Sequence, residues 1–457
     1  GRTLRYPGAF VQASDSPLKH LGPSPTVGQH TAQVLAEARE STSAKPTPRP
    51  ASTEPVAPLA GLKVVDLTWY MAGPSTTRML ADWGATVVRV ESVARPDGGR
   101  GSGPALNGRH GPDSGGYSLT HNSGKLGLAV NLTRPESRAV LEDLVRWADV
   151  AVVGYSPRAA RNLRLDYGSL SAVNPQLIML STCLMGQTGP LAEFAGFGNL
   201  SAAIAGFYEI GGWADRPPIG PYLAYTDVVA PRFSFCSVLA ALEHRERTGR
   251  GQLLDLSQAE STAHLLSPAV LDVQVNGRVA GRHGNDDDHA APHGVYPANG
   301  EDRWVAIACP DDRSWQALAG AMGRADLAGD PALATLAGRI EQRRELDEAV
   351  AAWTSSLTAA EVQDCLQALG VPAHELLDSA GCWADPQLQH RGHFQELSHP
   401  LHGTVRVQGP RLHFSRTATS VHRAAPPLGE DTFEVLHDLL GYDDDRIAEL
   451  AAAEVLE

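Results

Sequence analysis

Short runs of β-branched and aliphatic residues alternate with helical segments through residues 59–260. Because these runs are rich in Val, Ile and Leu, strands are predicted at 62–67, 86–90, 150–153, 177–180 and 253–256. Apolar residues at helical spacing predict helices at 75–83, 135–148, 198–210 and 227–247. Strands that alternate with helices predict an α/β fold with a doubly wound, Rossmann-like parallel sheet.

The pattern changes beyond residue 285. A strand-like run at 303–308 is followed by helical stretches, among them 344–356 and 359–369. This mixture predicts a second, smaller α+β domain. The expected boundaries are 59–260 for the large domain, 261–400 for linkers and the small domain, and 401–457 for a return of the chain to the large domain.

The residues before the large domain fall into two parts. Residues 36–58 are rich in Ala, Ser, Thr, Pro and Glu, a composition typical of a flexible linker. Residues 1–35 match the C-terminal end of the chain at a constant offset, through the pairs Arg5/Arg406, Gly8/Gly409, Ser14/Ser415, Gly28/Gly429, Thr31/Thr432, Val34/Val435 and Leu35/Leu436. Self-similarity in one register is a sign of duplication. We therefore hypothesise that residues 1–35 are the tail of an upstream copy in a tandem fusion; the alternative is an ordinary extension with chance similarity.

Composition narrows the class of protein. The chain has 457 residues, enough for two domains, and a net charge of −14, which argues against a nucleic-acid surface. Local Lys and Arg can still hold an anionic cofactor. The five cysteines are scattered without C-x-x-C spacing, which indicates reduced thiols in a cytoplasmic protein. We expect no membrane partner, because no apolar run is long enough to span a bilayer and no signal-peptide pattern is present.

Asp227 is the candidate catalytic residue. It lies in Pro221-Tyr-Leu-Ala-Tyr-Thr-Asp227, just ahead of a long apolar helical stretch. A carboxylate is ionised at pH 7 and can attack a thioester carbonyl without a general base. Aspartate is also a common helix N-cap, so a capping role is the alternative, and both roles can hold at once.

Three sequence blocks share their order with a known family. They include Leu62-Lys-Val-Val-Asp66-Leu with Ala72-Gly73-Pro74, then Asn174-Pro175 with Gly186-Gln-Thr-Gly-Pro190, and finally Asp227 with Thr248-Gly-Arg-Gly-Gln252. Together the blocks resemble the class III (CaiB/BaiF-type) CoA-transferases over residues 60–440. The resemblance implies that Asp227 attacks an acyl-CoA to give an aspartyl anhydride and then an aspartyl-CoA thioester, from which a carboxylic acid acceptor takes the CoA.

The resemblance also implies partners and cofactors. Coenzyme A is expected as a co-substrate, with no permanently bound cofactor and no metal. The family forms interlocked dimers, so a homodimer, or a pairing with the upstream copy, is expected. Two alternatives remain open: a weakly active CoA-binding half of a tandem or heteromeric transferase, and an acyl-CoA isomerase or racemase.

Matching positions carry over the expected CoA contacts. Lys125 corresponds to a lysine near the CoA phosphates, Tyr155 and Leu163 to positions flanking the adenine, and Met71 to a glutamine near the thioester in some relatives. Ser92 stands where some relatives have a nucleotide-binding arginine, so Arg89, Arg95, Arg158 or Arg161 would have to bind the nucleotide instead. Of these, Arg89 and Arg161 are the predicted contacts. For any lone Lys or Arg, a solvated surface position is the alternative.

The substrate positions depart from the family pattern. Phe197, Gly198 and Asn199 are expected near the reacting acyl group, but many relatives carry an acidic residue where Gly198 stands. Relatives that racemise an α-carbon have a His-Asp pair at 197–198. Phe197 cannot remove a proton, so racemisation is disfavoured. The alternative explanation for Gly198 is a tight turn into the following helix.

A second polar cluster lies at residues 283–293, with three histidines and three consecutive aspartates. Its irregular spacing is more typical of a polar loop than of a metal site, since no ligand geometry is implied. The family places a glycine-rich lid near this point. This chain offers only Gly281, Gly284 and Gly294 for such a loop.

Overall fold

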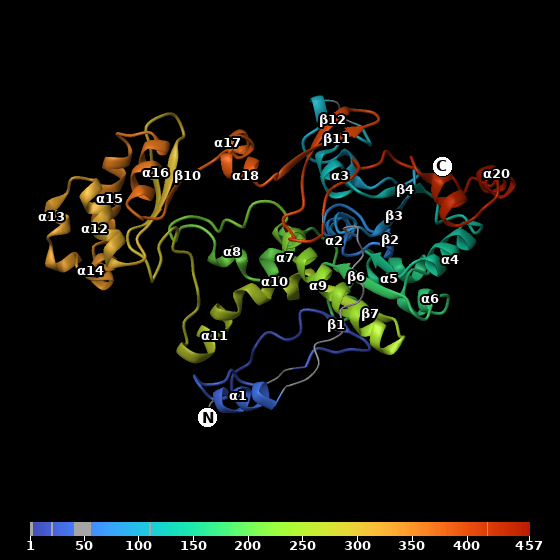
Figure 1. The fold of residues 1–457 in the computed structure, drawn as a ribbon, viewed down its shortest axis with the longest axis horizontal. Helices are drawn as coiled ribbons and strands as arrows, with labels where there is room; N and C mark the ends of the chain where they lie inside the picture. The colour runs from blue at the N-terminus through green and yellow to red at the C-terminus, as the bar shows by residue number, and fades with distance from the viewer. Residues whose placement is uncertain (1–2, 20–21, 41–55, 109–110, 418) are drawn as a thin grey trace. The chain divides into compact units, whose positions relative to one another are not determined.

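The computed structural model describes residues 3–19, 22–40, 56–108, 111–417 and 419–457 (Figure 1). The chain divides into two compact units. Unit 1 comprises residues 1–207, 220–279 and 392–457, and unit 2 comprises residues 208–219 and 280–391. No helix in the described ranges combines the length and apolar character needed to cross a membrane.

Unit 1 is built on a seven-stranded sheet in the order β1-β7-β6-β5-β2-β3-β4. Six strands run parallel: β2 (Lys63–Leu67), β3 (Thr86–Glu91), β4 (Leu126–Ala129), β5 (Val150–Val153), β6 (Ile178–Cys183) and β7 (Gln252–Ser257). The short strand β1 (Gln12–Ala13) is antiparallel on the β7 edge. The direction of strand addition reverses between β2 and β5, so the parallel, doubly wound sheet predicted from the sequence is confirmed.

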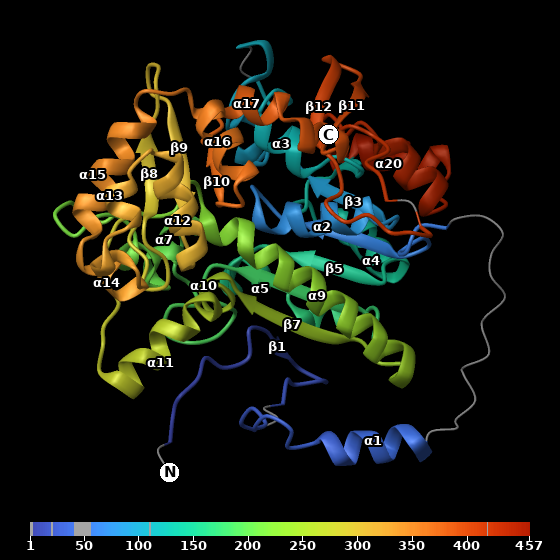
Figure 2. The same ribbon diagram turned by 60° about the vertical axis from the view of Figure 1, so that its left-hand side comes forward.

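Both faces of this sheet are covered. Val65 packs with Val140 and Leu144 of α4 (Ser137–Trp147) on one face. Val64 packs on the other face with residues of α2 (Ala72–Asp82) and α9 (Tyr225–Thr248), and Figure 2 shows α9 lying along the sheet. Successive strand residues point to opposite faces, which is why a sheet buried on both sides reads as continuous Val, Ile and Leu.

The remaining elements of unit 1 are short. The N-terminal helix is α1 (Thr31–Glu40). The others are η1 (Gly98–Gly101), η2 (Leu106–Gly108), α3 (Gly116–His121), α5 (Pro157–Asn162), α6 (Tyr167–Ser171), α7 (Gly198–Ile204), α10 (Gln258–Ala263), η3 (His264–Leu266), α11 (Ser267–Asn276), β11 (Phe394–His399), β12 (Gly403–Gln408), α19 (Thr432–Glu434), the π-helical η5 (Val435–Leu439) and α20 (Asp444–Ala452).

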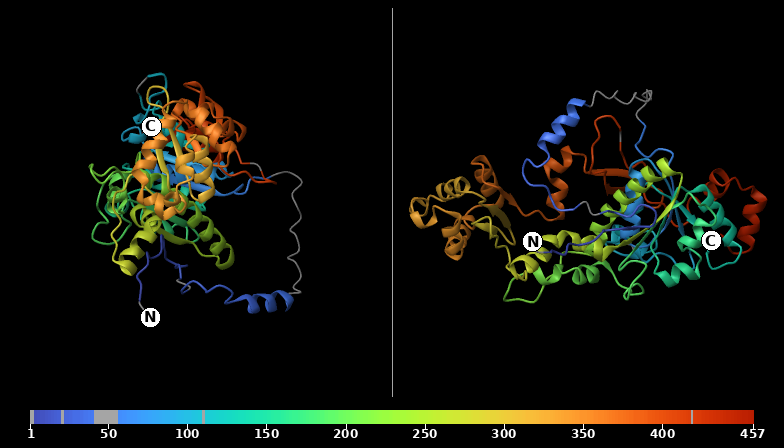
Figure 3. Two further views of the ribbon diagram at one scale, coloured as in Figure 1. Left: turned by 90° about the vertical axis from the view of Figure 1, so that its left-hand side faces the viewer. Right: turned by 90° about the horizontal axis from the view of Figure 1, so that it is seen from below.

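Unit 2 contains a three-stranded antiparallel sheet in the order β10-β9-β8, and its yellow-to-orange ribbon can be followed in Figure 3. The strands are β8 (His293–Pro297), β9 (Trp304–Ala308) and β10 (Ala373–Glu375). The helices are α12 (Asp312–Ala321), α13 (Ala325–Ala328), η4 (Pro331–Leu333), α14 (Leu336–Glu341), α15 (Arg343–Thr354), α16 (Ala359–Ala368), α17 (Ser379–Ala384) and α18 (Pro386–His390). Its core surrounds the fully buried Trp315. Helix α8 (Phe207–Ile210) begins at the boundary between the units.

The structure divides the chain differently from the expected boundaries at several points. Residues 261–279, expected among the linkers and small domain at 261–400, belong to unit 1, where they include α11. Residues 208–219 belong to unit 2, and unit 1 resumes at residue 392 rather than 401. The predicted linker at 36–58 is helical at its start, since residues 36–40 complete α1. Ala and Glu are strong helix formers, which favours this continuation. Residues 41–55 of that linker lie outside the described ranges.

Candidate active site

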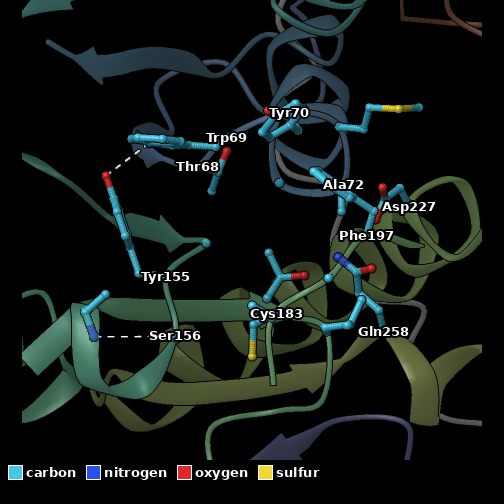
Figure 4. Close-up of a pocket in the computed structure, with 18 of the residues that line it drawn as sticks. Thr68, Trp69, Tyr70, Ala72, Tyr155, Ser156, Cys183, Phe197, Asp227 and Gln258 are labelled. Carbon is cyan, nitrogen blue, oxygen red and sulfur yellow. Dashed lines mark hydrogen bonds between the residues drawn. The ribbon is translucent and has the colours of Figure 1, made fainter. Parts of the chain in front are cut away.

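A cavity of about 540 Å³ opens at the carboxyl ends of strands β2, β5 and β6 (Figure 4). In an open α/β sheet, ligands bind at this edge, where the strand order reverses. The lining comes from loops that follow separate strands and from the start of two helices. It includes residues 68–73, 154–156, 182–184 and 194–197, together with Asp227 and Gln258.

Asp227 is the third residue of α9, and its side chain reaches the cavity wall. The helix has no side-chain cap, and its N-cap residue is Ala224, so the alternative role of Asp227 as the N-cap is wrong. The residue is only 8% exposed. Its carboxylate accepts hydrogen bonds from the Gly198 backbone N–H and from the Gln258 side chain. The carboxylate is therefore held in one orientation at the cavity surface.

Gln258 lines the cavity beside Asp227 and was not predicted from the sequence. It directly follows β7 and begins α10. The hydroxyl of Thr226 lies 3.0 Å from Gln258 Oε1 and 3.1 Å from the Gly198 carbonyl oxygen, two acceptors for its one proton. With Oε1 engaged in this way, the Gln258 amide N–H₂ is left to donate to Asp227. Its position at the end of a buried parallel strand was the signal available in the sequence.

Gly198 begins α7 and approaches Asp227 closely. A Cβ atom at Gly198 would lie 2.9 Å from Asp227 Cγ and 2.8 Å from Thr226 Oγ1. Its φ lies outside the left-handed region, so the turn proposed from the sequence is not the reason for glycine here. The reason is backbone approach, because a side chain would separate the Gly198 N–H from the carboxylate.

The wall across the cavity from Asp227 is aromatic (Figure 4). Trp69 Nε1 donates to the Tyr155 hydroxyl at 3.0 Å. The Arg95 guanidinium carbon lies 5.1 Å from the centre of the Trp69 ring, a cation–π arrangement. Leu163 also lines the cavity. This combination of flat aromatic faces and one cation can hold a purine ring and a phosphate group.

Met71 and Phe197 also lie in the cavity lining, as the sequence predicted. Phe197 is 54% exposed, and its ring meets the Tyr70 ring edge to face, with 5.2 Å between centroids. Asn199, predicted beside them, is exposed, and its Oδ1 accepts from the Leu200 N–H. Its side chain is not part of the cavity lining.

Lys125 does not reach the cavity. It is fully buried, and its ammonium donates to Asp66 Oδ2 at 2.8 Å, Asn122 Oδ1 at 2.8 Å and the Pro74 carbonyl at 3.0 Å. These three bonds use all the N–H donors of a lysine. The expectation that Lys125 contacts CoA phosphates is therefore wrong for this conformation; its charge neutralises the buried Asp66.

The two arginines predicted to bind the nucleotide also lie outside the cavity lining. Arg89 is fully buried and pairs with Glu91 and Asp97. Arg161 is exposed and pairs with Glu193 at 3.5 Å. Of the cations considered from the sequence, Arg95 lines the cavity.

Buried charged residues hold the loop that lines one side of the cavity. Asp97 accepts from the Tyr70 N–H at 3.1 Å and from the Gly99 N–H at 2.9 Å, and it pairs with Arg89 at 2.5 Å. Tyr70 has a φ of 60°, a left-handed conformation that is strained for an aromatic residue. The Asp97 carboxylate thus fixes the loop that carries Trp69 and Met71 into the site.

The polar segment 283–293 lies in unit 2. Asp286 pairs with Arg343 at 2.7 Å, and His293 Nδ1 lies 2.6 Å from the Asn285 carbonyl oxygen. In the ranges that the structure describes, no three His, Cys, Asp or Glu side chains are grouped in a way that could hold a metal ion.

The chain is similar to known proteins in sequence and in fold. The chain matches CoA-transferase family III over residues 59–432. It is 33% identical over 408 residues to a succinyl-CoA–D-citramalate CoA-transferase of Chloroflexus aurantiacus, covering 89% of this chain and all of that protein. It is 31% identical to a probable CoA-transferase of Mycobacterium tuberculosis, covering 95% of this chain but 54% of the relative.

A solved structure agrees with these sequence matches. The crystal structure of a CaiB/BaiF family protein from Brucella suis superposes with a TM-score of 0.77 at 30% identity. The match covers 84% of this chain and 99% of that one. The family resemblance read from the three sequence blocks is thus confirmed, and the chain belongs to CoA-transferase family III, the CaiB/BaiF family.

Proposed function

We propose that this class III CoA-transferase moves CoA from an acyl-CoA to a carboxylic acid through covalent intermediates on Asp227. The single observation that carries the proposal is the Asp227 carboxylate at the cavity surface, held by two N–H donors. Across the cavity, Trp69, Tyr155 and Arg95 supply the surface for the nucleotide end of CoA.

The reaction divides into four balanced steps. An Asp227 oxygen attacks the thioester carbonyl, the C–S bond breaks, and CoA thiolate leaves behind an aspartyl anhydride. The thiolate then attacks the aspartyl carbonyl, which releases the original acid as a carboxylate and leaves an aspartyl-CoA thioester. The acceptor carboxylate repeats these two steps in reverse, forming its own anhydride and then its own CoA ester. Asp227 returns to a free carboxylate without net proton transfer.

Gln258 and Gly198 serve both halves of this cycle. In the free enzyme they donate to the Asp227 carboxylate. When a thiolate or an acceptor attacks the aspartyl carbonyl, negative charge develops on the oxygen that these N–H groups already face. One such oriented donor typically contributes about 3 kcal/mol of transition-state stabilisation. These donors replace the side-chain amide that some relatives supply from a glutamine at the position of Met71.

Trapping tests the covalent step. The enzyme is incubated with acyl-CoA and no acceptor, treated with hydroxylamine, and digested for mass spectrometry. We expect a hydroxamate on the peptide that contains Asp227, and no adduct after treatment with free CoA alone. Bound acyl-CoA without any adduct at Asp227 would instead support the weakly active, CoA-binding half considered above.

The site supports transfer better than racemisation. Phe197 lines the cavity where a racemase would need a base, and a phenyl ring cannot accept a proton. For the donor we propose a succinyl-CoA-like dicarboxylyl thioester, since named relatives act with succinyl-CoA. A screen of acyl-CoA donors against acceptor acids, read by chromatography of the CoA esters, tests this assignment.

We propose an interlocked pairing of two large domains, from identical chains or from an upstream homologous copy. Relatives named as alpha and beta subunits of one transferase support pairing between homologous chains. The five cysteines are unpaired, which supports a cytoplasmic location.

The pH dependence of the first half-reaction should report Asp227. Burial raises the pKa of Asp227 to about 6, although the Gly198 and Gln258 donors oppose the increase. The active form is the ionised one, so the rate should rise about tenfold per pH unit up to pH 6 and level off above it. The measurement is the burst of released acid without acceptor, between pH 5 and pH 8.

The variant Gln258→Leu provides the matched control for this profile. It removes a donor that stabilises the ionised carboxylate, so the apparent pKa should move upward while the protein stays folded. A burst rate that stays constant down to pH 5 in the parent enzyme would contradict the proposed role of the Asp227 carboxylate.

A further inference from the structure

The C-terminal tail of this chain docks on the β4 edge of its own sheet. Asp431 N–H donates to the Gly127 carbonyl at 2.9 Å, and Asp431 Oδ2 accepts from the Gly127 N–H at 2.7 Å. Thr432 Oγ1 accepts from the Ala129 N–H at 3.0 Å. A Cβ at Gly429 would lie 2.7 Å from Ala129 Cβ, so this close approach requires glycine.

Residues 25–35 repeat the local geometry of residues 426–436. Gly28 has a φ of 79° and Gly429 a φ of 72°. The N–H of Thr31 donates to the Gly28 carbonyl at 3.2 Å, and that of Thr432 donates to the Gly429 carbonyl at 3.1 Å. A helix starts at the threonine in both places. Aligned residues therefore share backbone conformation as well as identity.

The two segments differ in burial. Val435 and Leu436 are fully buried in the core beside β4. Their counterparts Val34 and Leu35 are 57% and 52% exposed, and Val27 is fully exposed. Burying a Val or Leu side chain typically contributes about 1.5–3 kcal/mol, so these residues leave a large stabilisation unrealised.

We infer that residues 25–35 dock on the β4 edge of a second, homologous large domain, as 426–436 dock on this one. The binding site cannot be this chain's own β4 edge, because residues 426–436 already occupy it. The two segments also differ in sequence at one contact position. His30 aligns with Asp431, whose carboxylate pairs with the Gly127 N–H and with Arg423. The partner is therefore a homologous copy whose edge is complementary to His30.

The segment that precedes residues 25–35 is bound to the large domain of this chain. Gln12 and Ala13 pair with Asp255 and Leu254 of β7. Ser16 Oγ donates to Gln252 Oε1 at 2.9 Å. Residues 12–16 on one side and 25–35 on the other would thus bridge two large domains. The relative of which this chain covers only 54% has the length for two such copies.

A graft tests whether residues 25–35 encode a β4-edge tail. In the full chain, residues 426–436 are replaced by the sequence of 25–35 carrying His30→Asp, so that the contacts of Asp431 with Gly127 and Arg423 are kept. We expect cooperative unfolding with a thermal midpoint within about 5 °C of the parent. The control graft also carries Gly28→Val and Thr31→Val, which remove the positive φ and the Ala129 contact, and it should unfold at least about 10 °C lower. Equal midpoints for the two grafts would overturn the inference.

Peptide binding tests the docking itself and decides the matter if neither graft folds. The full-length variant Leu436→Ala loosens the native tail, and a labelled peptide of residues 22–40 carrying His30→Asp, which suits this chain's own edge, is titrated by fluorescence anisotropy. We expect saturable binding at least tenfold tighter than to the parent chain, whose edge is occupied. A peptide with Val34→Asp should not bind. Absence of binding, or binding unaffected by Val34→Asp, would overturn the inference, whatever the transferase activity.

Discussion

Replacing Asp227 by Asn is expected to abolish CoA transfer while making the protein more stable. A carboxamide cannot form the anhydride, so kcat should fall at least about a thousandfold. The substitution removes no interaction that the fold needs, because asparagine has the same shape and its oxygen can still accept from the Gly198 N–H and the Gln258 amide.

The gain in stability follows from the raised pKa of Asp227. The folded state holds a proton up to about pH 6, whereas the unfolded carboxyl releases it near pH 3.8. The folded state therefore binds more protons between these values, and stability falls as the pH rises through this window. At pH 7 the buried charge costs about 3 kcal/mol, of which Asp227→Asn should recover about 1–3 kcal/mol.

Urea unfolding at pH 7 and at pH 4 measures this effect. The difference in unfolding free energy between the variant and the parent should shrink at pH 4, where the parent's folded carboxyl is protonated. Asp364→Asn, which neutralises an exposed carboxylate, is the control and should change neither stability nor activity. A variant that loses activity together with stability would show that Asp227 serves the fold instead.

The sheet could be predicted because its parallel strands are buried on both faces. Val64 and Val65, or Val152 and Val153, are apolar on either side, and such runs stand out in the sequence. Strand β4 was not predicted, since Leu126-Gly-Leu-Ala is short and contains a glycine. Its glycine has a packing reason: the tail comes so close that a Cβ at Gly127 would lie 3.1 Å from Pro426.

The candidate active site was only partly predictable. Asp227, Met71 and Tyr155, predicted from motif positions that follow strands or begin helices, lie in the cavity lining. Gln258 was not, because a glutamine becomes a site residue only once Thr226 fixes its amide. The reason for Gly198 was also hidden, since it depends on the distance between two segments far apart in the chain.

The sequence did not predict which way the basic side chains point. Lys125 and Arg89 were expected at the CoA phosphates, but both point into the protein toward buried acids. A positive side chain at a motif position can face a ligand or a buried carboxylate, and spacing does not distinguish the two. Strand acids such as Asp66 and Glu91 were the available clue, because a buried carboxylate needs a cationic partner.

Replacing Lys125 by Met is expected to lower the free energy of unfolding by about 3–5 kcal/mol, because it leaves the buried Asp66 carboxylate without its cation. Burial favours the protonated form of Asp66, but the charges of Lys125 and Arg89 outweigh it and hold the pKa of Asp66 below its usual value, so the carboxylate is charged at pH 7. Lys125 itself, with a pKa lowered by burial to about 8, is also still charged there. Chemical unfolding at pH 7 measures the loss.

The double variant Lys125→Met with Asp66→Asn separates this structural role from CoA binding. With both charges removed, most of the lost stability should return, since a neutral asparagine needs no cation. The KM for acyl-CoA should then match that of the parent, because neither residue lines the cavity. If Lys125 held CoA phosphates, Lys125→Met would instead raise the KM for acyl-CoA severalfold at nearly unchanged stability. Adding Asp66→Asn would then not return the KM to the parent value.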